Sequence, residues 1–173
     1  MNIHVAKKEI GGLLPAGDHK VEITEAGIDF SKEQPNWTDR TPQLKVVAKN
    51  AKGQITAWMN LRGYKNSSDF EGGLAPKGHE FRSFDEGSEK FLVNSKTGKR
   101  VESTERTAKL LENVGNLAFA AGITQSDIEI EDLVSQLTES SVAVRVRENS
   151  RGQLEAYYFM PATDVKASAS IAG

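Results

Sequence analysis

Apolar and polar residues alternate through much of the segment 40–68. Two alternating runs, residues 43–50 and 54–62, flank a short turn that contains Gly53. Successive side chains of a strand point to opposite sides of a sheet, so this pattern predicts a β-hairpin with one apolar and one polar face. The apolar face comprises Leu44, Val46, Ala48, Ile55, Ala57, Met59 and Leu61.

The polar face of this hairpin holds an aromatic ring among cations, namely Trp58 with Lys45, Lys49 and Arg62. Segment 40–68 contains six Lys or Arg and no Asp or Glu, although the whole chain carries a formal charge of −2. A groove for single-stranded nucleic acid needs cations that attract phosphates and rings on which bases stack. We therefore expect this face to bind a single strand. The alternative is an ordinary solvated hairpin face with one partly buried Trp.

Three further segments alternate and predict strands: residues 19–28, 141–148 and 153–160. In the first, Val21 and Ile23 fall on the inner face. In the second, three valines lie opposite Ala143, Arg145 and Arg147. In the third, strict alternation groups Leu154, Ala156 and Tyr158 on one face and Glu155, Tyr157 and Phe159 on the other.

Apolar residues at helical spacing predict a helix over about 103–121, ended by Gly122, and a shorter helix over about 130–137. The elements therefore run strand, strand, strand, helix, strand, strand. This is the element order of the OB-fold, a five-stranded Greek-key barrel. We expect a mainly β protein with helix, in which residues 1–160 form a single OB-fold domain. Residues 63–101 are then an insertion between the third strand and the helix, with a small hairpin at 90–101, and residues 161–173 are a flexible tail.

The composition argues against an enzyme. The chain has 173 residues and no cysteine, which excludes disulfides, thiol catalysis and cysteine-based zinc sites. Its three histidines are far apart, and it has neither a phosphate-binding Gly-rich loop with its lysine nor a nucleophile elbow. The acids between Asp127 and Asp132 are expected to be a solvated helix start rather than a cation site. We therefore predict no enzymatic activity, no cofactor and no metal.

Neither a long apolar run nor a signal-peptide pattern is present, so the expected location is the cytoplasm, without membrane association.

Further candidates come from the loops that flank the hairpin. Trp37 lies in the polar loop 30–42, where it either covers the core or stacks on a base. The hairpin tip at Lys96–Arg100 is either a finger along a nucleic-acid strand or a charged surface turn. The complete predicted nucleic-acid-binding set is Trp37, Arg40, Lys45, Lys49, Trp58, Arg62, Tyr64, Lys65, Arg145, Arg147 and Tyr157.

The chain also resembles a family. The sequence LPAGDHKVEITEA at 14–26 is similar to the opening of phage-encoded single-stranded-DNA-binding proteins, and AAGI at 120–123, followed by Asp132-Leu133 and a final strand pair, is similar to their later part. The resemblance spans residues 13–160. It implies an OB-fold, the host cytoplasm, and a role in phage DNA replication or recombination. Replication or recombination proteins and further copies of the chain are the additional partner options, although no residue pattern indicates an oligomeric state.

A non-catalytic, largely sequence-independent single-stranded-DNA-binding protein is the first hypothesis. The second is a phage protein-interaction or adaptor module on the same barrel, because exposed aromatics and arginines are also typical of protein interfaces. RNA is a third option, because nothing in the residues separates RNA from DNA.

Overall fold

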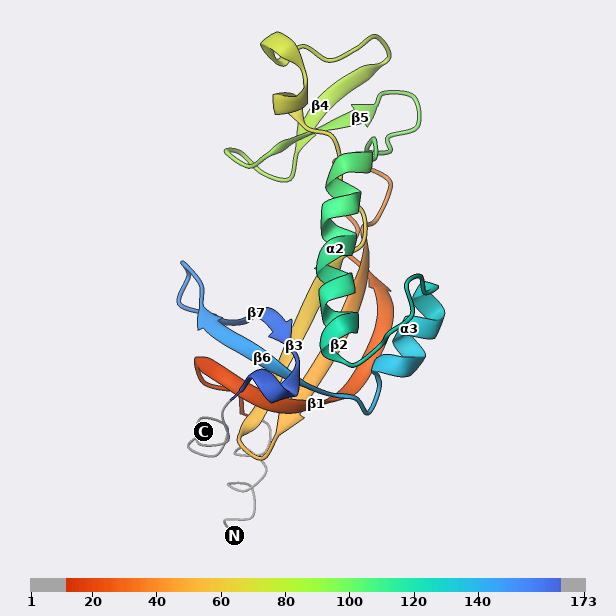
Figure 1. Cartoon of the computed structure of the whole chain (residues 1–173). Coiled ribbons are helices and arrows are strands. Elements are labelled where there is room, and N and C mark those ends of the chain that lie inside the picture. Colours follow the sequence, from red (N-terminus) through yellow and green to blue (C-terminus); the bar gives the residue numbers. More distant parts are fainter. Residues whose placement is uncertain (1–11, 166–173) are drawn as a thin grey trace. The chain divides into compact units, whose positions relative to one another are not determined.

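The computed structural model describes residues 12–165, which form two compact units (Figure 1). Unit 1 contains residues 12–28, 44–59 and 113–165, and unit 2 contains residues 29–43 and 60–112. The predicted insertion, residues 63–101, falls within unit 2. Residues 166–173 of the predicted tail lie outside the described residues, and the preceding residues include a short helix, η3 (Ala162–Asp164), and the buried Val165.

Five strands form the sheet of unit 1. They are β1 (Gly17–Phe30), β2 (Pro42–Asn50), β3 (Gly53–Asn60), β6 (Ser141–Glu148) and β7 (Leu154–Met160). Their order across the sheet is β3-β2-β1-β6-β7, and β6 is antiparallel to both of its neighbours. The predicted hairpin and the three other predicted strands are thus confirmed, with boundaries shifted by no more than a few residues. Within residues 12–165, β3 and β7 are not paired with each other, so the sheet is not a closed barrel.

One face of this sheet forms the core of unit 1, as the alternation predicts. The inward residues are almost completely covered, because every second side chain of a strand points to the same side. They include Val21, Ile23, Leu44, Val46, Ala48, Ile55, Ala57, Val142, Val144 and Val146. The opposite face is the outward face. Its small side chains at Val47 and Ala143 are also buried, whereas its long side chains reach solvent.

A β-bulge in β7 breaks the strict alternation that we predicted for its side chains. Arg145 is opposite Tyr158 and Val146 is opposite Ala156, so Tyr157 is the extra residue. A bulge places two residues of one strand against one of its partner and shifts the facing of those that follow. Our grouping of Tyr158 with Ala156, and of Tyr157 with Phe159, was therefore wrong. Phe159 is buried opposite Val144, and both tyrosines are exposed.

Two helices follow, as predicted: α2 (Thr104–Ala120) and α3 (Ile130–Leu137). Gly122 ends α2 with a φ of 82°, a left-handed conformation that glycine adopts without steric cost. Its N–H donates to the carbonyl of Phe119, and the N–H of Ile123 donates to that of Ala118, which satisfies two free carbonyls of the last turn. No helix among the described residues is long and apolar enough to span a membrane.

Unit 2 contains a two-stranded antiparallel sheet of β4 (His79–Ser83) and β5 (Lys90–Asn94), preceded by the short helices η1 (Ser67–Asp69) and η2 (Glu71–Gly73). The predicted hairpin at 90–101 is present only as a tight turn with a single bridge between Val93 and Arg100. The main partner of β5 is β4, which the sequence pattern did not predict. The mainly polar sequence of β4, HEFRS, shows no clear alternation of apolar and polar residues.

Candidate nucleic-acid interface

Two arginines of β6 lie against two tyrosines of β7 on the outward face. The guanidinium carbon of Arg145 is 4.8 Å from the ring centroid of Tyr158, and that of Arg147 is 3.5 Å from that of Tyr157. The two tyrosine rings meet edge to face, with centroids 5.2 Å apart. Tyr157 is 48% exposed and Tyr158 is 40% exposed. The bulge thus presents two adjacent rings, each supported by a cation and still open to solvent.

A third cation–aromatic pair lies on β2 and β3. The Lys45 Nζ is 5.4 Å from the centroid of the Trp58 ring, and Trp58 is 50% exposed. Both residues occupy outward positions, since their neighbours Leu44, Val46 and Ala57 point into the core. The exposure of Trp58 agrees with the strand alternation from which its place was predicted.

These three pairs belong to the outward side of one sheet within unit 1, and we refer to them as the cation–aromatic face. Its members are Lys45, Trp58, Arg145, Arg147, Tyr157 and Tyr158. Rings that are open to solvent can stack with any base, and adjacent cations can meet the phosphates that join such bases. Lys49 is also exposed on β2, and it has no ion-pair partner among residues 12–165.

Each cation of this face is held by a carboxylate. Lys45 Nζ lies 3.3 Å from the Glu25 carboxylate, and Arg147 Nε lies 3.7 Å from that of Glu155. Arg145 donates from Nε and Nη2 to the two carboxylate oxygens of Asp18, at 2.7 and 3.0 Å. The local charge is therefore largely compensated before any ligand binds.

The Asp18–Arg145 pair has the strongest geometry of the three. Hydrogen bonds from Arg145 lower the pKa of Asp18 below its ordinary range, and the same contact raises the pKa of Arg145. Asp18 therefore remains a carboxylate at any pH near neutrality. Exposed ion pairs contribute little to stability, so a phosphate can replace the carboxylate at small cost.

Two of the predicted stacking residues are buried in unit 2 instead. Trp37 is 7% exposed and Tyr64 is 5% exposed. Their rings surround the side chain of Arg100, whose guanidinium carbon lies 4.5 Å from the Trp37 centroid and 3.8 Å from the Tyr64 centroid. Arg100 is itself nearly buried and pairs with Asp39 at 3.0 Å. In this conformation neither ring presents a free face for a base, and their packing around Arg100 forms the core of unit 2.

The remaining predicted residues also belong to unit 2. Arg40 donates from Nε to the Ser31 carbonyl at 2.6 Å, Arg62 pairs with Glu102 at 2.8 Å, and Lys65 is exposed. The predicted set is thus divided. Lys45, Lys49, Trp58, Arg145, Arg147 and Tyr157 lie in unit 1, and Trp37, Arg40, Arg62, Tyr64 and Lys65 lie in unit 2.

The binding set predicted from the sequence did not include Tyr158 or the three carboxylates of Asp18, Glu25 and Glu155. The Tyr157-Tyr158 pair was the available signal, because two consecutive large aromatics in a half-exposed strand fit strict alternation poorly. Asp18, Glu25 and Glu155 gave no such signal, since their pairing with cations depends on strand register.

Comparison with known proteins adds no relative: no protein-family model matches the chain, and no curated protein matches it significantly. The resemblance to phage single-stranded-DNA-binding proteins therefore stays a prediction from the residues quoted for it.

Proposed function

We propose that this protein binds single-stranded nucleic acid, without catalysis and largely without sequence preference, through the cation–aromatic face of unit 1. The observation that carries the proposal is the set of three exposed rings, Trp58, Tyr157 and Tyr158, each within 5.4 Å of a cation on the same side of one sheet. Isolated apolar side chains on a surface need no explanation, but three exposed aromatics paired with cations on one sheet face are unusual.

The proposed mechanism has two parts. Bases stack on the free faces of the rings, which gives affinity without hydrogen-bond readout of the bases. Phosphates displace the carboxylates of Asp18, Glu25 and Glu155 from their cations and release bound counterions, which makes binding sensitive to salt. Paired bases hide their faces inside a duplex, so a duplex can bind only through its phosphates.

The sheet order supports an OB-type architecture as the finer description of unit 1. An OB barrel is partly open and binds oligonucleotides on the face of its second and third strands and on the loop between its last two strands. In this chain those regions correspond to β2 and β3, with Lys45 and Trp58, and to the turn between β6 and β7, next to Arg147 and Tyr157. We propose that unit 1 is such a barrel, open between β3 and β7.

DNA is the proposed ligand because of the resemblance to phage single-stranded-DNA-binding proteins, and phage DNA replication or recombination is the proposed role. The contacts described above involve base faces and phosphates, which RNA shares, so a matched RNA strand belongs in the same experiments.

A protein partner is the second candidate, and one observation favours it. All three cations of the face are already compensated by carboxylates. A surface of aromatics with balanced charges suits a protein interface, where Tyr, Trp and Arg contribute most of the binding energy.

Titration with a fluorescently labelled oligo-dT over a range of salt concentrations separates the two candidates. We expect affinity to fall as salt rises, with a log–log slope of roughly −0.7 for each phosphate contacted, and we expect a duplex of equal length to bind more weakly. Absence of binding to the single strand, or affinity that does not change with salt, would favour the protein partner.

A further inference from the structure

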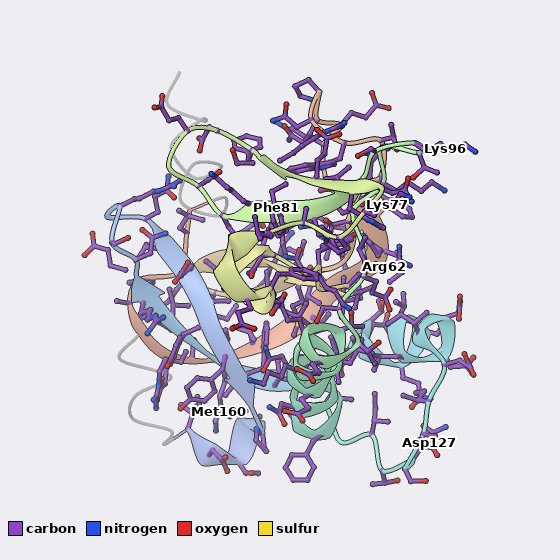
Figure 2. The ribbon with its side chains drawn as sticks, turned by 90° about the horizontal axis from the view of Figure 1, so that it is seen from above. Arg62, Lys77, Phe81, Lys96, Asp127 and Met160 are labelled. Carbon is purple, nitrogen blue, oxygen red and sulfur yellow. The ribbon has the colours of Figure 1, made fainter. Side chains whose placement is uncertain are left out.

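Three exposed lysines lie together at one end of the small sheet in unit 2. Lys96 and Lys99 belong to the turn that follows β5, and Lys77 precedes β4. The two segments are joined by a hydrogen bond of 3.0 Å from the Ser95 N–H to the Gly78 carbonyl. Lys77 and Lys96 lie at the same end of this sheet in Figure 2, where the Lys96 side chain extends away from the protein. We refer to Lys77, Lys96 and Lys99 as the lysine tip.

The turn that carries two of these lysines is held in place from several sides. The side-chain oxygen of Asn94 accepts hydrogen bonds from the N–H groups of Lys96 and Thr97, at 2.9 and 3.1 Å. Thr38 donates from its N–H to the Gly98 carbonyl at 2.9 Å and from its hydroxyl to the Thr97 carbonyl at 3.0 Å. Gly98 has a φ of 74°, and a Cβ there would lie 2.8 Å from the Thr38 methyl group. Lys96 and Lys99 therefore extend from a turn whose backbone is fixed by hydrogen bonds, so little backbone entropy is lost when they bind a ligand.

Unlike the cations of the cation–aromatic face, those of the lysine tip are not compensated. None of the three has an ion-pair partner among residues 12–165, whereas two carboxylates of unit 2, those of Glu80 and Asp39, are paired with arginines. Glu80 pairs with Arg82 at 3.1 Å, and Asp39 pairs with Arg100 at 3.0 Å. A phosphate that binds here displaces no carboxylate. The lysine tip is thus a concentrated site of free positive charge in a chain whose formal charge is −2.

We propose that the lysine tip is a second contact for single-stranded nucleic acid, which binds the phosphates of the same strand whose bases stack on the cation–aromatic face. This inference rests on the proposed function. Flexible ammonium groups, which are compact point charges, suit phosphates rather than base faces. Both contacts belong to one chain, so binding at the first raises the effective concentration of the strand at the second. Only strands long enough to reach both contacts gain this advantage.

The test compares two triple variants of the full chain. The first, Lys77→Gln with Lys96→Gln and Lys99→Gln, removes the tip. The second, Lys32→Gln with Lys90→Gln and Lys109→Gln, removes three other exposed lysines of unit 2 and changes the net charge equally. Affinity of each for oligo-dT of about 5 and about 30 nucleotides is measured as a function of salt.

For the tip variant we expect unchanged affinity for the short strand and weaker binding of the long strand. The log–log salt slope for the long strand should be smaller in magnitude by about 2, because three phosphate contacts at roughly 0.7 each are lost. The control variant should follow the unmodified protein. Equal losses in both variants would mean that only net charge matters, and unchanged slopes in the tip variant would mean that the tip does not touch the strand. Either result overturns the proposed contact at the lysine tip. Binding of the short strand would still support the contact at the cation–aromatic face. Failure of the unmodified protein to bind any strand overturns both, and an acidic protein would then be the ligand to test.

Discussion

Asp18 holds Arg145 through two hydrogen bonds of 2.7 and 3.0 Å, so one of the arginines proposed to bind phosphate is occupied by a carboxylate of the adjacent strand. If phosphate binding requires exchange of this carboxylate, Asp18 limits the affinity of the surface. Removal of Asp18 therefore shows whether Arg145 binds a ligand or only stabilises the sheet.

Replacement of Asp18 by Asn should strengthen binding to a single strand. Asn keeps the shape of the side chain but removes the charge that competes with phosphate. We expect several-fold tighter binding at low salt, because the phosphate that contacts Arg145 no longer has to displace a carboxylate. Glu22→Gln is the matched control, because Glu22 is exposed on the same strand and has no ion-pair partner among the described residues. Equal effects of the two changes would indicate a general field effect rather than release of Arg145.

Stability should fall in acid as two aspartates become protonated. The pKa of Asp18 is lowered by hydrogen bonds from Arg145, and that of Asp69 by hydrogen bonds from Arg106 and the Asn66 N–H. A lowered pKa in the folded state contributes stability that is present above the ordinary aspartate pKa of about 4 and is lost as the pH falls through the folded value. Urea unfolding between pH 7 and pH 2.5 measures this. The difference between the unmodified protein and Asp18→Asn should be small, because the pair is partly exposed to solvent, and should disappear at the acid end of the range.

Trp58→Ala should weaken binding without unfolding the protein. Half of the Trp58 side chain is exposed, so stability should change by no more than about 0.5 kcal/mol. Loss of one base–aromatic stack should cost about 1–3 kcal/mol of binding free energy. Phe119→Ala is the control, because Phe119 is 70% exposed in the same unit but lies on α2 rather than on the sheet. Thermal melting and oligo-dT titration on both variants decide the point, and a large fall in the melting temperature of Trp58→Ala would contradict the face assignment.

Nucleic acid should quench the fluorescence of only one of the two tryptophans. Trp58 is exposed on the cation–aromatic face, whereas Trp37 is 7% exposed and packed against Arg100. Stacking with a base should therefore quench Trp58 and leave Trp37 largely unaffected. Trp58→Phe should abolish most of the quenching on titration with oligo-dT, and Trp37→Phe should preserve it. Quenching that survives in Trp58→Phe would locate the bound strand elsewhere.

Arg100→Ala should destabilise unit 2. It removes the cation between the rings of Trp37 and Tyr64 and leaves the nearly buried Asp39 carboxylate with only the N–H of residue 100 in place of the guanidinium. Loss of one member of a buried pair typically costs about 3–5 kcal/mol. Arg62→Ala provides the comparison, because its ion pair with Glu102 is exposed on both sides and should contribute much less. Urea unfolding followed by near-ultraviolet circular dichroism, which reports on the packed aromatic rings, measures the difference. Similar losses in the two variants would mean that the aromatic cluster does not depend on Arg100.

The sequence alone determined the main elements of unit 1 and the facing of most of its strands. Alternation of period two is a local property, so it predicts that Val21, Leu44 and Val144 point inward and that Trp58 and Arg145 point outward. Helical spacing and a glycine after the last turn likewise predicted α2 and its end at Gly122.

Tertiary structure decided what no local pattern contains. Pairing of β7 with β6 placed the bulge at Tyr157 and so turned Tyr158 toward Arg145, because a bulge is a property of two strands and not of one. Strand register likewise set Asp18 against Arg145. Long-range packing placed Trp37 and Tyr64 around Arg100, and pairing of β4 with β5 brought Lys77 beside the turn that carries Lys96. The sequence therefore predicted which residue types could bind a strand, and the fold decided which of them are exposed, which are paired and which are buried, since those properties depend on neighbours far away in the chain.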